Sequence, residues 1–250
     1  YDAIFYGDSR VYRGVDPETT LEGLDRNGYN LGLSSGSFSE KMLKLVEAKL
    51  EKSEKSMIVL GVTPFAFTEE ALLDEQFKEL NALNRFEKWQ RAKVSGALSY
   101  FDRIRIVDLL GIEENKPLKY LHRNGWSEDF TSLNDTLDGL NIYKRELINN
   151  PIEEEAIRNL IKKVDEWTNS GIEVFAFRPP TFITMEIVEN DSSGFDEKSF
   201  IQSFENAGGE WIYVDKKGYK TYDGSHLEST EALKLSKFLG EEIKRSLKEE

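Results

Sequence analysis

The chain of 250 residues contains no cysteine and only two histidines. Without cysteine it forms no disulfide and offers no thiolate ligand for a metal. No apolar stretch approaches the roughly 18 residues that a membrane-spanning helix needs. These absences exclude a disulfide framework, a cysteine-bound metal and a membrane span within these 250 residues.

Basic residues are also scarce, with 33 lysines and arginines against 46 aspartates and glutamates, which gives a net charge of −13. A strongly acidic chain repels nucleic acid and anionic membranes, so we expect no nucleic-acid partner. No Gly-x-Gly-x-x-Gly motif follows the first predicted strand, which makes a nucleotide-binding domain the weaker alternative. A hydrophobic fraction of 39% is sufficient for a globular core.

Short apolar runs alternate with stretches of helical periodicity along most of the chain. This alternation predicts an α/β fold with a mainly parallel sheet. Right-handed crossovers then give a three-layer α/β/α sandwich of flavodoxin-like strand order, formed by residues 1–250 as one domain. The predicted strands are residues 3–6, 29–33, 56–62, 172–177 and 211–214.

Residues 68–150 interrupt this alternation, because their apolar residues recur at helical spacing and no strand is predicted among them. The segment leaves the carboxyl end of the central strand, where ligands of parallel sheets bind, so it is a candidate helical insertion and lid. A purely structural appendage is the alternative. Within it, His122 and Trp126 are of types that contact sugars or polar head groups, although a single histidine in a loop is more often a surface residue.

Two motifs at opposite ends of the chain carry candidate chemistry. Gly-Asp-Ser at residues 7–9 ends the first predicted strand, and Asp223 and His226 precede the last predicted helix. A serine hydroxyl becomes a good nucleophile when an imidazole takes its proton and a carboxylate fixes the tautomer of that imidazole. The motifs therefore supply the three groups of a Ser-His-Asp triad.

Together, Gly7-Asp8-Ser9 and Asp223-x-x-His226 resemble the first and last blocks of the SGNH/GDSL hydrolase superfamily, in the same chain order. The resemblance covers nearly the whole chain except the insertion, and it implies the same α/β/α architecture. It further implies that Ser9 is the nucleophile, His226 the general base and Asp223 its orienting carboxylate. This chemistry needs neither a cofactor nor a metal.

The oxyanion of such a reaction needs donors beside Ser9. The Ser9 N–H is one, and the resemblance implies a glycine N–H as the second, for which Gly36 is the first choice and Gly32 the second. The third block of the family has an asparagine where this chain has Thr63. Thr63 or Arg178, which follows the fourth predicted strand, is therefore the candidate for the remaining donor.

Each motif also has an ordinary structural interpretation. Ser9 can be the N-cap of a helix with Asp8 as a turn residue, and His226 can be a surface residue near a helix start. The missing asparagine favours a non-catalytic binding or scaffold module that keeps the fold, which is the alternative to the enzyme.

The resemblance extends to a substrate class and a location. An ester hydrolase or an O-acyltransferase acting on an acylated carbohydrate is expected, since some extracytoplasmic members of the superfamily are similar to polysaccharide O-acetyltransferases. Those members carry an N-terminal membrane anchor. Because the chain begins at Tyr1, directly before its first strand, we expect an upstream segment of this kind and a cell-envelope location.

Overall fold

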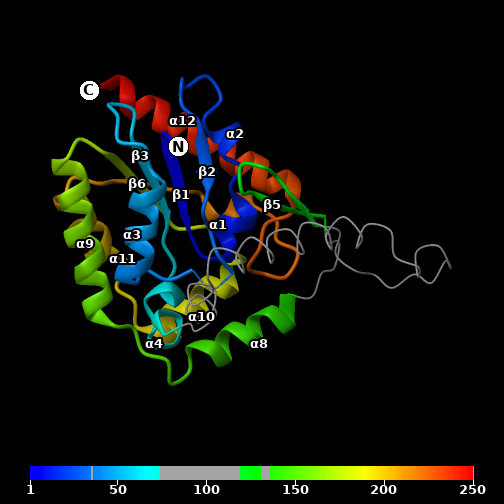
Figure 1. The fold of residues 1–250 in the computed structure, drawn as a ribbon. Coiled ribbons are helices and arrows are strands. Elements are labelled where there is room, and N and C mark those ends of the chain that lie inside the picture. The colour runs from blue at the N-terminus through cyan, green and yellow to red at the C-terminus, as the bar shows by residue number, and fades with distance from the viewer. Residues whose placement is uncertain (35, 74–118, 131–135, 250) are drawn as a thin grey trace, which may run out of the picture. The chain divides into compact units, whose positions relative to one another are not determined.

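One five-stranded sheet forms the centre of the protein (Figure 1). The computed structural model describes residues 1–34, 36–73, 119–130 and 136–249. The strand order is β2-β1-β3-β6-β7, and every neighbouring pair is parallel. The predicted α/β fold and its flavodoxin-like order are confirmed. The strands are β1 (Ala3–Gly7), β2 (Gly28–Asn30), β3 (Met57–Gly61), β6 (Glu173–Phe177) and β7 (Glu210–Ile212).

Helices cover both faces of this sheet, as the three-layer prediction requires. One face packs against α1, α2 and α12, and the other against α3, α9 and α11 (Figure 1). Helix α10 lies near the carboxyl ends of the strands and packs on α8. The helices are α1 (Ser9–Gly14), α2 (Pro17–Thr20), α3 (Glu40–Lys49), α4 (Glu69–Leu72), α8 (Thr136–Leu147), α9 (Glu154–Asn169), α10 (Ile183–Ser193), α11 (Glu197–Asn206) and α12 (Ser229–Glu249), with 3₁₀ turns η1 (Pro64–Phe67) and η2 (Lys216–Gly218).

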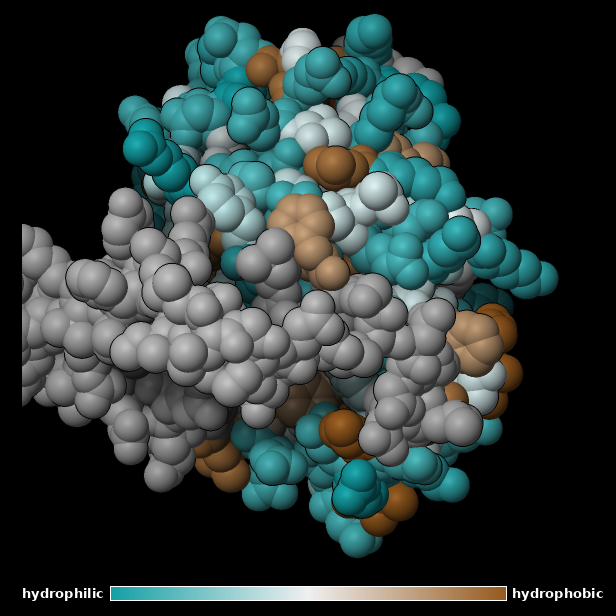
Figure 2. Space-filling model, turned by 90° about the vertical axis from the view of Figure 1, so that its right-hand side faces the viewer, coloured by the Kyte–Doolittle hydropathy of each residue, from teal (hydrophilic) through white to brown (hydrophobic). Residues whose placement is uncertain are grey.

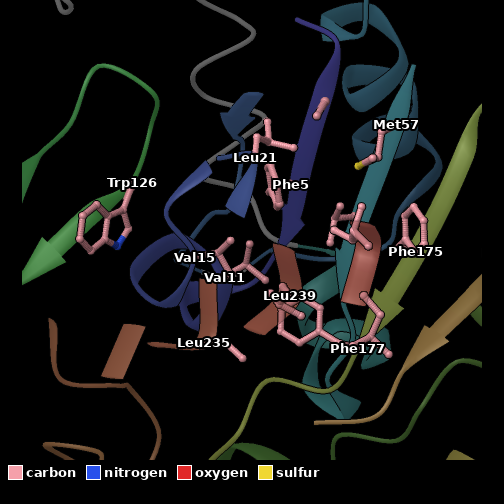
Figure 3. Close-up of a cluster of buried hydrophobic side chains, with 14 of the residues drawn as sticks. Phe5, Val11, Val15, Leu21, Met57, Trp126, Phe175, Phe177, Leu235 and Leu239 are labelled. Atoms are coloured by element: carbon pink, nitrogen blue, oxygen red, sulfur yellow. The ribbon is translucent and has the colours of Figure 1, made fainter. Parts of the chain in front are cut away.

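The two central strands are buried along their whole length, which explains their uninterrupted apolar sequences. On the α12 side, Phe5 and Val59 of the sheet meet Leu235 and Leu239 in one buried cluster (Figure 3). The four-residue spacing of the α12 leucines puts them on one helical face. On the other side the core is aromatic. Its rings come from Phe38, Phe67, Phe195, Phe200, Phe204 and Trp211.

The strand predicted at residues 29–33 differs in its limits, because β2 ends at Asn30. The chain nevertheless stays hydrogen-bonded to β1 beyond that point. The N–H of Leu31 donates to the carbonyl of Phe5 at 2.8 Å, and the N–H of Leu33 donates to that of Gly7 at 3.1 Å. This contact carries the following loop to the turn that holds Ser9.

The expectation that residues 68–150 contain no strand is wrong. Strands β4 (Lys119–Leu121) and β5 (Ser127–Asp129) form an antiparallel hairpin, whose turn includes Gly125 with a φ of +87°. The hairpin turn pairs with the edge of the main sheet, where the Asn30 N–H donates to the Asn124 carbonyl at 2.7 Å. Helices α4 and α8 agree with the helical prediction, and residues 74–118 and 131–135 lie outside the described residues.

Contacts divide the chain into two units, Tyr1–Leu72 with Leu118–Glu250, and Leu73–Pro117. All but Leu73 of the second unit lies outside the described residues. On the face of the molecule in Figure 2 the described surface is mostly hydrophilic, with separated hydrophobic groups. Among the described helices, none is long and apolar enough to cross a membrane.

Candidate active site

Ser9 follows the strand at which the strand order of the sheet reverses. Strand β1 is flanked by β2 on one side and β3 on the other, so the chain crosses over in opposite senses from this strand. Ligand crevices of doubly wound sheets form at such a switch point. The strand ends at Gly7 and helix α1 begins at Ser9, so the serine stands at the rim of the sheet.

The helix cap at this turn is Asp8 and not Ser9. The Asp8 carboxylate accepts a hydrogen bond from the backbone N–H of Arg10 at 2.9 Å, which satisfies a donor at the start of α1. The Ser9 hydroxyl is therefore not used in capping. Only 6% of Ser9 is exposed, and its Oγ meets a side chain from the other end of the chain.

The structure brings Ser9, His226 and Asp223 into one hydrogen-bonded chain. The distance between Ser9 Oγ and His226 Nε2 is 2.7 Å, and the distance between His226 Nδ1 and Asp223 Oδ2 is 2.6 Å. An ionised carboxylate only accepts hydrogen bonds, so the imidazole proton is on Nδ1 and Nε2 accepts from Ser9. This is the arrangement in which an imidazole deprotonates a serine.

The loop before α12 holds Asp223 in place through the backbone. Its Oδ1 accepts from the N–H of Ser225 at 2.9 Å and from the N–H of His226 at 2.7 Å. Gly224, between Asp223 and Ser225, has a φ of +85°, a conformation that side-chain-bearing residues rarely adopt. The sequence Asp-Gly-Ser-His thus folds the carboxylate back onto the imidazole that follows it.

Burial and hydrogen bonding set the protonation of the pair. Burial, the largest effect, lowers the pKa of His226; Asp223 counteracts part of this, and the charges of Arg13 and Arg10 lower it further. Burial alone raises the pKa of Asp223, but the hydrogen bond and charge of His226 and two backbone N–H groups outweigh it and bring the pKa to about 2. At neutral pH the site therefore holds a carboxylate and a neutral imidazole.

Tyr222 fixes the plane of the imidazole. Its ring stacks on that of His226, with ring centroids 5.7 Å apart and an interplanar angle of 18°. Its hydroxyl donates to Asp129 Oδ2 at 3.0 Å and accepts from Arg13. Because Asp129 is in β5 and Arg13 in α1, Tyr222 links the imidazole of His226 to the hairpin and to the helix that begins at Ser9.

Of the two glycines expected to donate to an oxyanion, Gly36 lies beside the turn before Ser9 and Gly32 lies against Tyr12 of α1, and both N–H groups have acceptors. Gly36 packs on the turn before Ser9 so tightly that an added Cβ would be 2.2 Å from the carbonyl oxygen of Gly7. Its N–H donates to the Leu33 carbonyl at 3.2 Å. The N–H of Gly32 donates to the side chain of Asn30 at 2.9 Å. Gly36 is thus close to the turn before Ser9, but its N–H is already bonded to Leu33.

The expected third donors are directed elsewhere. The fully buried Thr63 donates its hydroxyl proton to Asp8 Oδ2 at 2.7 Å. Arg178 donates to Asn190 at 2.8 Å, to Glu197 at 2.5 Å and to Glu189 at 3.1 Å. The structure therefore differs from the expectation that Thr63 or Arg178 donates to the oxyanion. Both side chains donate to nearby carboxylates, which are strong acceptors.

His122 and Trp126 have structural contacts. Trp126 is 3% exposed, belongs to the buried cluster and donates its indole N–H to the Arg13 carbonyl at 2.8 Å (Figure 3). The His122 ring stacks on Trp126 with centroids 4.5 Å apart and pairs with Glu128 at 2.9 Å. The Trp126 ring is therefore part of the core, and the expectation that Trp126 contacts a sugar is not supported.

The sequence interpretation missed a polar cluster beside the triad. Arg10 contacts Ser225 and Glu189, and Tyr143 of the insertion contacts Ser225. Two features of the sequence could have indicated it. An arginine directly follows Ser9, and Glu189 lies four residues after the buried Met185, on the inner face of α10. A carboxylate at a core position of a helix indicates a buried cationic partner.

Among the described residues, no group of three or more histidines and acidic residues is placed to hold a metal ion. In comparisons with known proteins, no family model and no curated protein matches the chain. The chemistry of the site therefore follows from its own residues.

Proposed function

We propose that the protein is a serine-dependent acyl-transfer enzyme, an ester hydrolase or O-acyltransferase. The observation that carries this is the continuous hydrogen-bonded chain from Ser9 Oγ through His226 to Asp223, at 2.7 Å and 2.6 Å. Nucleophile and base are within hydrogen-bond reach, and a third group orients the base. Membership of the SGNH/GDSL superfamily, which the two motifs resemble, is part of the proposal.

In the first half of the reaction Ser9 becomes acylated. Ser9 Oγ attacks the ester carbonyl carbon while His226 Nε2 takes the hydroxyl proton. The bond from that carbon to the leaving oxygen then breaks, and His226 returns the proton to the departing alcohol. Asp223 stays ionised throughout and stabilises the imidazolium, in keeping with its low pKa.

In the second half, water or a carbohydrate hydroxyl attacks the acyl-serine. His226 removes the proton of the attacking hydroxyl and delivers it to Ser9 Oγ as the acyl group leaves. Water as acceptor makes the protein an esterase, and a sugar hydroxyl makes it an O-acyltransferase. The substrate that we propose is an acylated carbohydrate, which the resemblance implies. The proposed location is extracytoplasmic, and fractionation of cells that express the protein tests it.

Oxyanion stabilisation in this proposal centres on the Ser9 N–H. Helix α1 begins at Ser9, and the first N–H groups of a helix have no partner within it. Such a group points toward an oxyanion formed on its own serine. Gly36 is the neighbouring candidate, provided that its 3.2 Å bond to Leu33 gives way when substrate binds.

The alternative is a binding or scaffold module without turnover. Two observations favour it. The Thr63 hydroxyl donates to Asp8, and the Arg178 guanidinium donates to Glu197 and Glu189, so neither donor is free for an oxyanion. Loss of one oxyanion donor costs about 10²- to 10³-fold in rate in other serine enzymes. A module of this kind would keep the triad geometry without a measurable acyl-enzyme.

A chromogenic acetyl ester distinguishes these two functions. The proposed enzyme releases nitrophenolate from p-nitrophenyl acetate and gains one acetyl group on Ser9, located by peptide mass spectrometry. Adding carbohydrate acceptors then separates transfer from hydrolysis, because a transferase forms acetylated sugar. Folded protein that neither releases nitrophenolate nor becomes acetylated favours the non-catalytic module.

A further inference from the structure

Arg10 is a buried cation that contacts both halves of the candidate site. It is 3% exposed and follows Ser9 in α1. Its Nε donates to Ser225 Oγ at 2.9 Å, and its two terminal nitrogens donate to the two carboxylate oxygens of Glu189. The guanidinium carbon also lies 5.0 Å from the centre of the Tyr143 ring.

The contact between Arg10 and Ser225 runs beside the contact between Ser9 and His226. Each pair consists of sequence neighbours, so two adjacent residues of the nucleophile turn meet two adjacent residues of the base loop. The distances are 2.7 Å for Ser9 to His226 and 2.9 Å for Arg10 to Ser225. The loop is also held by the Tyr222 hydroxyl and by the Gly224 carbonyl, which accepts from the Phe182 N–H at 2.9 Å. The contact with Arg10 adds a constraint at Ser225, directly beside His226.

Ser225 passes this constraint on to the triad. Its backbone N–H donates to Asp223 at 2.9 Å, and its hydroxyl donates to Tyr143 at 2.7 Å while accepting from Arg10. A displacement of Ser225 therefore moves both the carboxylate and the imidazole beside it. Tyr143 extends the contact to α8.

Glu189 anchors the arginine from α10. It is 1% exposed and pairs with Arg178 as well as with Arg10. Burial raises its pKa, but the two arginines outweigh burial and hold the pKa below its ordinary value, so the carboxylate stays ionised. Glu197 completes the cluster through Arg178 at 2.5 Å, giving two cations and two anions.

Such a cluster stabilises a fold less than well-packed apolar residues of the same volume often do. Its advantage is directional, because a guanidinium donates in a fixed plane to partners on different sides. Arg10 uses that geometry to face Glu189 with one edge and Ser225 with the other.

We infer that Arg10 is a positioning residue of the proposed acyl-transfer reaction, which holds the Asp223–His226 loop in register with Ser9 through Ser225. The inference rests on the proposed function. It assigns Arg10 no contact with substrate. Glu189 in turn fixes Arg10.

The test is the rate at which a fluorophosphonate modifies Ser9 across a pH series. Ser225→Ala removes the hydroxyl that Arg10 holds, and Arg10→Lys keeps the charge without the fork. Both should slow modification by about 10- to 100-fold at the pH plateau, because a small misplacement of reacting groups has effects of that size. Neither should shift the pH midpoint.

Arg10→Met adds a readout that loss of stability alone does not change. The charges acting on His226 are Asp223, Arg13 and Arg10, so removing Arg10 should raise the pH midpoint as well as slow the reaction. Should Arg10→Met fail to fold, Ser225→Ala and Arg10→Lys decide. The control is Arg26→Met, which removes the ion pair with Glu173 at the start of β6 and should lower only the thermal midpoint.

The outcomes separate this inference from the proposed function. Absence of modification in folded wild-type protein overturns the proposed function. Wild-type protein that reacts, together with folded Ser225→Ala and Arg10→Lys variants that react at the wild-type rate, overturns the positioning role alone. Slower variants with unchanged Arg26→Met behaviour support it.

Discussion

The hydroxyl of Thr63 donates a 2.7 Å hydrogen bond to the carboxylate of Asp8, the residue before Ser9. Thr63 follows β3 and Asp8 follows β1, so this bond joins the ends of the two central strands. The other oxygen of Asp8 caps α1 through the Arg10 N–H. Thr63 thus supports the nucleophile turn from the side, at the position where the SGNH pattern has an oxyanion donor.

Thr63→Val should therefore affect stability more than chemistry. It leaves one buried oxygen of Asp8 without its donor, which costs about 1–3 kcal/mol in the free energy of unfolding. Urea denaturation measures that loss, and Thr63→Ser should largely restore it. The Thr63 hydroxyl already donates to Asp8, so its loss should change the rate of Ser9 modification little. The decrease in Thr63→Val should be smaller than the decrease of about 10²-fold that loss of an oxyanion donor causes.

Modification of Ser9 should rise with pH to a plateau, with a midpoint below pH 6.5. In the proposed mechanism the neutral imidazole is the base, and burial holds the pKa of His226 below its ordinary value of 6.5. Arg13→Met should move the midpoint upward, since the Arg13 charge lowers this pKa. A wild-type midpoint well above 6.5 would show that the imidazole is more easily protonated than its burial implies.

Stability should decrease on acidification for the same reason. The unfolded chain binds a proton at His226 near pH 6.5, before the folded protein does, so the free energy of unfolding falls as pH drops from about 6.5 toward the folded pKa. The stabilisation from Asp223, whose pKa is lowered from 3.8 to about 2, is present above 3.8 and is lost toward 2. Urea denaturation at about pH 7.5 and about pH 5.5 should show a smaller difference for His226→Gln than for wild type.

Trp126 should behave as a core residue. Trp126→Ala should reduce the free energy of unfolding by about 3–5 kcal/mol, the usual cost of emptying a large aromatic site. Trp126→Phe keeps most of the volume and loses the indole bond to Arg13, which costs about 1 kcal/mol. Urea denaturation of the three proteins tests this order, and an alanine variant as stable as wild type would return Trp126 to the list of candidate substrate contacts.

The sheet was predictable because its strands carry a strong local signal. Residues 56–62 form an uninterrupted apolar run, and such runs between helical patterns specify a buried parallel sheet. The hairpin of β4 and β5 escaped because each strand has three residues, too few for a period to show. Its Asn124-Gly125 pair, a sequence that favours tight hairpin turns, was the signal that could have revealed it.

The contacts of His226 with Ser9 and Asp223 were also predictable, since the residue types and their chain order are distinctive. The partners of Thr63 and Arg178 were not. Each was correctly expected to follow a strand at the edge of the sheet where Ser9 lies, but the direction of a side chain depends on which acceptor is nearest in space. Asp8 and Glu189 provide those acceptors, and Asp8 lies 55 residues from Thr63 in the sequence.

The most direct test of the account is covalent labelling of the intact protein with a fluorophosphonate, followed by peptide mass spectrometry. Wild type should gain one adduct, on Ser9. Ser9→Ala and His226→Ala should gain none, while His122→Ala, which changes the other histidine of the chain, should label like wild type. An unlabelled but folded wild type, or equal labelling of His226→Ala, would contradict an activated serine at this site.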